Sequence, residues 1–429
     1  MFDKPILQFT DNLSTLRDSV ALISQLIEKH SSDYLDKHLV PFKEILNQAF
    51  EKIPENKKDS LKIGIAPDRP HCVHFVSGDP GEEKPYELFI ENASAAKSFP
   101  EFQRMMTNVR SRKTFLYQNS LISLASFVEW FTSEFLKIHL ERYPEAAELS
   151  KKTLTLTDLK SMGSIEDATK FLIDSKIDEI LRDSFEGWCS FFKEKLKLSM
   201  SYMTKEMPLL VEIFQRRNII VHNGGRANSI YISKVAPELR EGISIDTELI
   251  VTDKYLEASI QVLELNMVLV CAELWKKVNA DDAARGELLN AMAVNHMVKE
   301  RWAIGTGISQ FVLNDKGLPE RDKLAGQLNY WQGVKWQGRY NEIKEEVERT
   351  DFTAKNEVFQ IALHALSDRF DSFYKLLPKV YESRKLEVKH LVSWPIFREI
   401  RKQKAYAEFR ELHKADFEAA ELQLRESFC

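Results

Sequence analysis

A long stripe of apolar residues, spaced three or four positions apart, dominates the chain after Arg112. Its members are Leu121, Ala125, Val128, Phe131, Phe135 and Ile138. Because an α-helix turns once every 3.6 residues, this spacing places all these side chains on one helix face, where they can be buried. Glycine and proline, which interrupt helices, number only 15 and 14 among 429 residues. The sequence therefore predicts an all-α protein with long helices.

The first hundred residues contain one stretch of different character. Residues 12–51 have helical spacing and predict two helices. Residues 61–92 instead hold three short β-rich pieces separated by proline and glycine turns, which read LKIGI, CVHFV and YELFI. We therefore expect residues 1–103 to form a small α(+β) lobe, helical with a short β-rich insert.

The middle of the chain, residues 104–280, is predicted to form a helical bundle. Beyond the apolar stripe, long helices are expected at 177–200 and from Pro208, since proline is favoured at the first helical position. The latter should stop at Asn223-Gly224-Gly225, because these residues tolerate left-handed backbone. A helix at about 255–278, apolar on most sides, is expected at the centre. The intervening pieces SIYI and GISIDTELIV predict a short β excursion.

A repeated pattern marks residues 284–429. The segments GRYNEIKEEV (338–347) and DRFDSFYKLL (368–377) each have a turn residue, an arginine, an aromatic residue, and apolar residues three and seven positions on. The preceding pieces LNYWQGVKWQ and VFQIALHALS would be the first helix of each pair. The spacing is near the period of helical-hairpin repeats, roughly 30–40 residues. The region resembles a degenerate tetratricopeptide-type solenoid, which implies a helical-repeat domain.

Charge and cysteine usage limit the possible partners and compartment. The formal net charge is -5, so any nucleic acid must be bound through a local basic patch. The N-terminus has no signal-peptide pattern, and no apolar run approaches the roughly 20 residues of a membrane helix. The four cysteines are far apart: Cys72, Cys189, Cys271 and Cys429. A reduced, cytoplasmic protein without membrane contact is expected.

The sequence offers little for a metal or another cofactor. His71-Cys72-x-His74 has the composition of half a metal site, but no matching second half is evident. There is also no phosphate-cradling glycine loop, no paired CxxC and no nucleophile elbow. We therefore expect no metal and no cofactor.

The segment PLLVEIFQRRNIIVHNGGR (208–226) carries the strongest chemical signal. On a helix, Arg217 falls on one line with Leu210, Phe214 and Val221, within an apolar stripe. An unpaired guanidinium would be costly there, so it requires an anionic partner or a solvated cleft. His222 lies in the last turn, and histidine is the side chain that titrates near neutral pH.

This segment resembles a known family. Arg217-Asn218-Ile219-Ile220-Val221-His222 is similar to the Arg-Asn-x-x-x-His motif of HEPN domains, the higher-eukaryote and prokaryote nucleotide-binding helical bundles. The helices over about 112–278 resemble the four- to five-helix HEPN arrangement. The resemblance implies a homodimer whose paired motif helices form a composite cleft. It also implies metal-independent RNA cleavage, in antiviral, toxin–antitoxin or RNA-processing systems.

The resemblance also assigns roles to individual residues. His222 would be the acid/base and Arg217 the cation that stabilises the phosphate, while Asn218 would orient the pair or bind phosphate. Glu129 matches the acidic position that often meets the motif arginine, and Arg216 is a supporting neighbour. Three further cations are candidate RNA contacts, although a solvated helix start or a plain surface position is the simpler explanation for them: Arg112, Lys113 and Arg226.

The predicted function is endoribonuclease activity by 2′-OH attack, with a 2′,3′-cyclic phosphate product, in bacterial antiviral, abortive-infection or toxin-type defence. The repeat domain would recognise a partner protein, a phage component that acts as trigger, or the RNA. The main alternative is a non-catalytic helical adaptor that dimerises through the bundle and binds protein through its repeats. A third possibility is binding or transfer of a nucleotidyl group at the same cleft.

Overall fold

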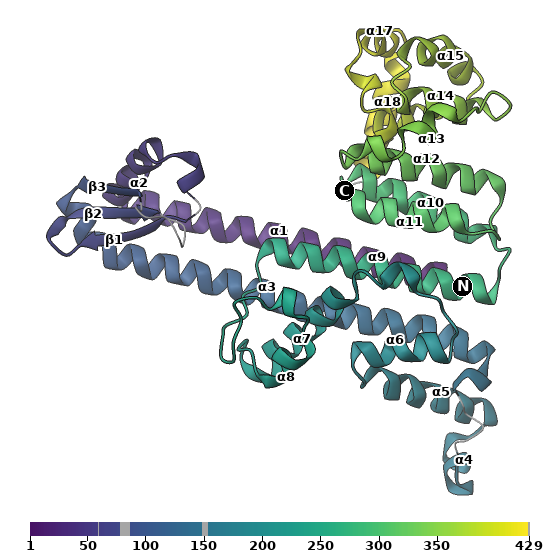
Figure 1. Ribbon diagram of the computed structural model, residues 1–429, viewed down its shortest axis with the longest axis horizontal. Coiled ribbons are helices and arrows are strands. Elements are labelled where there is room, and N and C mark those ends of the chain that lie inside the picture. The colour runs from purple at the N-terminus through teal and green to yellow at the C-terminus, as the bar shows by residue number, and fades with distance from the viewer. Residues whose placement is uncertain (59, 78–85, 148–152, 428–429) are drawn as a thin grey trace.

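The computed structural model describes residues 1–58, 60–77, 86–147 and 153–427 of the chain. Within these ranges helices predominate, and the single β-sheet has three strands. The all-α prediction is therefore confirmed in its coarse form, together with the small N-terminal α(+β) lobe. Figure 1 shows three parts: a lobe at the end of a helical arm, a central bundle, and an upright C-terminal lobe.

The N-terminal lobe packs helix α2 and the start of α3 against an antiparallel sheet of order β1-β2-β3. One sheet face supplies the core of the lobe, with Val73, Phe75 and Ile90 buried against Phe42 and Phe99. The three predicted β-rich pieces are these three strands. The elements are α1 (Asp3–His38), α2 (Val40–Lys52), β1 (Lys62–Ala66), β2 (Arg69–Ser77), β3 (Tyr86–Glu91) and α3 (Ala93–Arg142).

Helix α3 connects the lobe to the bundle without interruption. Its 50 residues correspond to about 75 Å at 1.5 Å per residue. Helix α1 lies alongside it, and the two form the arm in Figure 1. The boundary expected between residues 103 and 104 falls inside α3, so the N-terminal lobe and the bundle share this helix.

The bundle surrounds helix α9, as its apolar composition predicts. Helix α1 contributes Phe9, whose ring stacks on Phe131 of α3 at 4.4 Å. Within the described ranges, α9 alone is long and apolar enough to span a membrane, and 78% of that stretch is buried inside the protein. The remaining bundle helices are α4 (Leu156–Met162), α5 (Ile165–Leu181), α6 (Phe185–Glu194), α7 (Met207–Asn223), α8 (Ser229–Lys234) and α9 (Asp253–Val278).

Two local predictions for the bundle are wrong. The helix expected at 177–200 is broken, because Ser184 caps a new helix by accepting a hydrogen bond from the Gly187 N–H at 3.2 Å. The piece SIYI lies in α8, because the Asn228 side chain accepts the Tyr231 N–H and starts a helix there. Of the second piece, only Glu248 forms an isolated β-bridge, with Arg226.

The C-terminal lobe stacks helix pairs. The two predicted units correspond to α12 followed by α13, and to α14 followed by α15. Its helices are α10 (Ala283–Val298), α11 (Trp302–Asn314), α12 (Glu320–Trp336), α13 (Lys344–Arg349), α14 (Glu357–Leu366), α15 (Phe370–Glu382), α16 (Val388–Ser393), α17 (Lys404–Leu412) and α18 (Lys414–Ser427).

A third pair, α10 with α11, has the same turn as the two predicted units. In each turn an arginine N–H bonds the carbonyl five residues earlier, at 2.9, 3.1 and 2.9 Å for Arg301, Arg339 and Arg369. The residue before each arginine has positive φ, and these residues are Glu300, Gly338 and Asp368. The repeated turn therefore occurs three times in the lobe.

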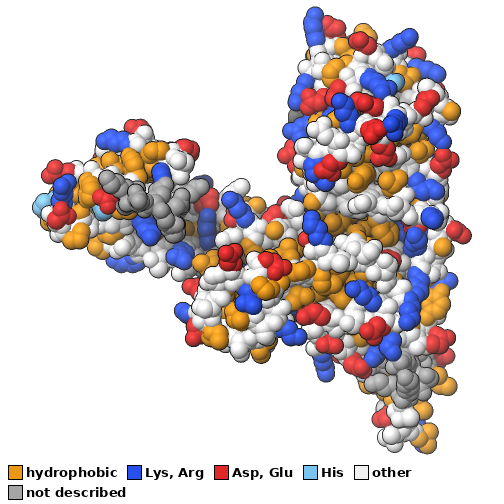
Figure 2. Space-filling view, viewed as in Figure 1, with side chains coloured by type: hydrophobic (Ala, Val, Ile, Leu, Met, Phe, Trp, Pro, Cys, Tyr) orange, Lys and Arg blue, Asp and Glu red, His pale blue; other side chains and the backbone are white. Residues whose placement is uncertain are grey.

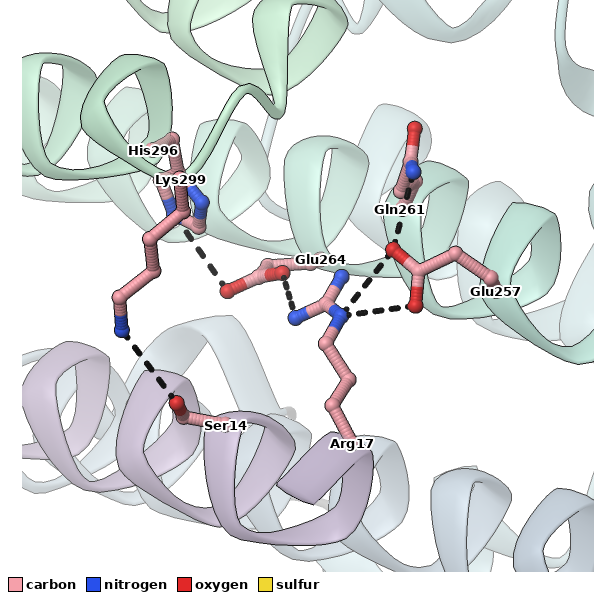
Figure 3. Close-up of polar contacts among 7 residues, drawn as sticks. All are labelled: Ser14, Arg17, Glu257, Gln261, Glu264, His296 and Lys299. Atoms are coloured by element: carbon pink, nitrogen blue, oxygen red, sulfur yellow. Dashed lines mark hydrogen bonds and ion pairs between the residues drawn. The ribbon is translucent and has the colours of Figure 1, made fainter. Parts of the chain in front are cut away.

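The C-terminal lobe meets the bundle at a buried polar junction, drawn in Figure 3. Arg17 of α1 pairs with Glu257 at 3.0 Å and with Glu264 at 2.8 Å, both on α9. His296 of α10 lies 3.5 Å from the other Glu264 oxygen. Burial, followed by repulsion from Arg17, lowers the pKa of His296 to about 3. We call these four residues the junction.

Candidate functional site

Helix α7 carries the motif and has the ends that the sequence predicts. It spans Met207–Asn223, with Pro208 in its first turn, where the missing N–H is tolerated. Gly224 ends it in the left-handed conformation, at φ 58°. The Gly225 N–H then bonds the Ile219 carbonyl at 3.1 Å. The motif histidine therefore lies in the last turn of a well-terminated helix.

One face of α7 lines a cleft of about 480 Å³, which we call the motif cleft. Its other walls come from α3, from the corner between α5 and α6, and from the start of α8. The charged residues and the histidine that line it are Glu129, Arg182, Asp183, Arg217 and His222. Asn218 lines it as well. The fold thus brings the three predicted catalytic residues to one cavity.

Arg217 has the anionic partner that its position in an apolar stripe requires. Its guanidinium pairs with Glu129 of α3 and donates a hydrogen bond to the Asn218 side-chain oxygen at 3.1 Å. The Arg217 and Glu129 side chains remain 21% and 33% exposed, so water still reaches the pair. The predicted contact between Glu129 and Arg217 is present.

His222 is exposed and lines the same cleft. The preceding residue, Val221, lies on the helix face between Arg217 and His222 and is 47% exposed. This face of α7 is therefore buried at its N-terminal end, where Leu210 and Phe214 lie, and open at its C-terminal end.

Arg216 belongs to a different, structural cluster behind α7. It pairs with the buried Glu212 at 2.7 Å and lies 4.2 Å from the ring centre of Tyr255 on α9. Glu212 also accepts hydrogen bonds from the Tyr231 and Tyr255 hydroxyls at 2.7 and 2.5 Å. Burial, followed by the Glu212 charge, raises the pKa of Tyr255. Arg216 thus fixes α7 against α9 and does not line the cleft.

The three candidate RNA-contacting cations lie outside the motif cleft. Arg226 donates to the Asp246 carbonyl at 2.9 Å, beyond the glycine stop. Lys113 pairs with Glu28 of α1 at 2.6 Å, and this contact raises its pKa. Arg112 lines a smaller cavity of about 190 Å³ on the arm. The 17 positions between Arg112 and Glu129 place it about 25 Å along α3 from the motif cleft.

The corner between α5 and α6 supplies cleft residues that the sequence analysis missed. Arg182, Asp183 and Ser184 all line the motif cleft. They were missed because one continuous helix was predicted through them. A signal was present, since Asp183-Ser184 is a typical helix-capping pair placed directly before the apolar start of α6.

The sheet carries the residues considered as half a metal site. Among the described residues, no three histidine, cysteine, aspartate or glutamate side chains gather as metal ligands do. His74 stacks instead on the Phe89 ring at 4.1 Å, and Arg69 lies over the same ring at 5.1 Å.

Comparison with known proteins leaves the site to be argued from its own geometry. No protein-family model, no curated protein and no solved structure matches this chain.

Proposed function

We propose that this protein is a metal-independent endoribonuclease of the HEPN type, acting at the motif cleft. The observation that supports this most strongly is the placement of Arg217, Asn218 and His222 on one open cavity, with Glu129 holding the arginine. Arginine, amide and histidine side chains are the kinds of group that RNA cleavage uses, because the nucleophile belongs to the RNA itself and the protein has only to move protons and stabilise charge.

The proposed reaction uses the RNA 2′-hydroxyl. His222 of one protomer accepts the proton of this hydroxyl and the 2′-oxygen attacks the adjacent phosphorus. The bond to the 5′-oxygen breaks, and this oxygen takes a proton from the protonated second copy of His222 in the homodimer. The Arg217 fork contacts the phosphate oxygens, where negative charge develops. The products are a 2′,3′-cyclic phosphate and a 5′-hydroxyl. Acid–base assistance of this kind contributes roughly 10²–10⁴-fold to the rate.

The proposed active form is a homodimer. One protomer offers one histidine, whereas the reaction needs a base for the 2′-hydroxyl and an acid for the leaving 5′-oxygen. The exposed Val221 and the 60% exposed Ile230 border the open end of α7. A twofold axis there would cover these apolar side chains and add a second His222. In Figure 2, hydrophobic side chains reach the surface over the bundle.

The biological setting is proposed on the family resemblance. We place the enzyme in the cytoplasm, in bacterial antiviral, abortive-infection or toxin-type defence. The stacked helix pairs of the C-terminal lobe would then bind the protein partner or phage component that triggers activity. No cofactor is required by this chemistry.

The test is cleavage of single-stranded RNA in the presence of EDTA by the wild type, Arg217→Ala and His222→Ala. We expect wild-type products with 2′,3′-cyclic phosphate ends and a loss of at least about 100-fold in both variants. His71→Ala, an exposed histidine of the N-terminal lobe, is the matched control and should cleave normally. Equal cleavage by all four proteins would rule out the proposed enzyme. So would a lack of cleavage by every protein, both with and without overexpressed phage proteins.

One observation favours the alternative of a helical adaptor. The Arg217 charge is already matched by Glu129 within one protomer, as a purely structural pair would be. An adaptor should keep its oligomeric state and its bound partners in both motif variants. Loss of RNA cleavage with unchanged folding would separate the two functions.

A further inference from the structure

The motif residues alone give the cleft little net positive charge with which to bind a polyanion. Arg217 is matched by Glu129, and the whole chain carries a net charge of -5. On the face that Figure 2 shows, Lys and Arg side chains are interspersed with Asp and Glu. RNA affinity grows with the number of phosphates that meet cations. A second cation in the cleft is therefore decisive for the proposed function, on which the following inference rests.

Arg182 is the other arginine that lines the cleft. Its side chain is 83% exposed, and the nearest carboxylate, Asp178, lies 3.9 Å away and is itself 70% exposed. A surface pair at this distance is weak and is easily exchanged for a phosphate. Arg182 can thus bind a phosphate without breaking a strong contact.

The backbone beneath Arg182 is well fixed. Its N–H bonds the Asp178 carbonyl at 3.1 Å at the end of α5, and the Asp183 N–H bonds the Ile180 carbonyl at 3.1 Å. Ser184 then caps α6. The corner therefore presents the Arg182 guanidinium, held only by its weak pair with Asp178, from a hydrogen-bonded wall of the cleft that α7 also lines.

The neighbouring carboxylate, Asp183, also lines the cleft, but it is engaged by the start of α6. Asp183 accepts the Ser184 N–H at 2.6 Å and lies against the first turn of α6. It lies so close that a Cβ atom on Gly187 would be 2.2 Å from its carboxylate oxygen. The partly positive helix end offsets the Asp183 charge. Trp188, another lining residue, has a buried indole N–H with no hydrogen-bond acceptor among the described residues.

We propose that Arg182, which lines the same cleft as Arg217 and His222, binds an RNA phosphate next to the one that is cleaved. Its planar fork matches two phosphate oxygens. It is a binding residue for the backbone of single-stranded RNA and takes no part in the proton transfers. Its contribution therefore lies in affinity and not in the rate of the chemical step.

The experiment measures binding of a fluorescent single-stranded RNA oligonucleotide of mixed sequence as a function of salt, in the His222→Ala background. Adding Arg182→Gln should weaken binding about tenfold and lower the slope of log Kd against log salt by roughly 0.7. Arg182→Lys should keep the slope. Lys170→Gln, which removes one charge from α5 outside the cleft, should leave both quantities unchanged.

Cleavage kinetics, measured in protein that retains His222, distinguish the role of Arg182 from the proposed ribonuclease function. Arg182→Gln should raise KM about tenfold and leave kcat nearly unchanged. If the wild type cleaves RNA but Arg182→Gln behaves as Lys170→Gln does, the role of Arg182 is overturned and the ribonuclease stands. If the wild type neither binds nor cleaves RNA, both are overturned.

Discussion

The motif cleft and the junction contain the same kinds of side chain in opposite surroundings. In the cleft, Arg217 and Glu129 are 21% and 33% exposed. In the junction, the Arg17 and Glu264 side chains are 7% and 0% exposed, and that of His296 is 4% exposed (Figure 3). Each region thus combines an arginine, a glutamate and a histidine. The cleft pair is partly exposed, whereas Glu264 and His296 of the junction are sealed and only Glu257, at its edge, is exposed, at 40%.

The difference shows that solvent access, rather than residue type, distinguishes the candidate site from the junction. Burial lowers the pKa of His296 to about 3, so this imidazole stays neutral near pH 7, and its side chain is only 4% exposed. His222 meets solvent in a cavity large enough for a nucleotide phosphate. The comparison predicts that the junction governs stability and the cleft governs activity.

The largest expected effect is on the junction. Arg17→Ala leaves the Glu264 carboxylate buried without its cation, and we expect the free energy of unfolding to fall by about 3–5 kcal/mol. Urea denaturation measures this change. The double variant Arg17→Met with Glu264→Met removes both charges of the buried pair. Most of the lost free energy of unfolding should therefore be recovered. A loss below about 1 kcal/mol in Arg17→Ala would contradict the comparison.

A second effect is the response of stability to acid. Between pH 6.5 and about 3, unfolded chains bind a proton at His296 that the folded protein excludes. Stability therefore falls as the pH is lowered through this range, by up to about 1.4 kcal/mol per pH unit. Burial raises the pKa of Glu264, so above pH 4.5 the folded protein binds a proton at this residue more readily than the unfolded chain does. Glu264 therefore opposes the loss of stability that His296 causes on acidification.

His296→Gln tests this response. Its melting temperature should fall less than that of the wild type between about pH 7 and about pH 5.5. The melting temperature of His296→Gln should still fall somewhat with pH, because burial, followed by the Lys277 charge, also lowers the pKa of His139, to about 4. Parallel curves for wild type and His296→Gln would show that the junction histidine is not sealed.

A smaller effect is expected at the end of the motif helix. Gly224 has φ 58° and open space where a Cβ atom would lie, so Gly224→Ala should introduce backbone strain alone, about 1 kcal/mol. Gly224→Asn should be milder, because asparagine tolerates this conformation. Gly64, which also has open space but no positive φ, provides the control. A larger loss in Gly64→Ala than in Gly224→Ala would refute this interpretation of the turn.

The smallest stability effect belongs to the cleft pair. Arg217→Gln should change the free energy of unfolding by less than about 1 kcal/mol, because the pair is partly solvated. RNA cleavage should nevertheless be lost. Equal destabilisation by Arg17→Ala and Arg217→Gln, measured side by side in urea, would remove the distinction between the two regions.

Local sequence patterns predicted much of the helical framework. The central position of α9 and both ends of α7 follow from apolar spacing, Pro208 and Gly224. The break before α6 was missed, because the apolar residues on both sides of Ser184 keep the same helical phase. The third repeated turn was missed as well, since Glu300 stands where a glycine or asparagine is usual.

The candidate site was predicted in part. The motif residues and Glu129 do lie together at one cleft, although Arg217 and Glu129 are 88 positions apart in the chain. Arg182 was not found, because nothing in its own segment relates it to α7. The roles of these residues in catalysis remain predictions of the motif resemblance.

By itself, the sequence determined most of the helical segments and which side chains share a helix face, since both depend largely on neighbours within a few residues. Only the tertiary structure decided which polar groups keep contact with water. Arg17 and Glu264 are 247 positions apart, and their burial results from the packing of three helices. Solvent access depends on the sum of such distant contacts, which explains why similar Arg, Glu and His side chains form a largely buried junction in one place and an open cleft in another.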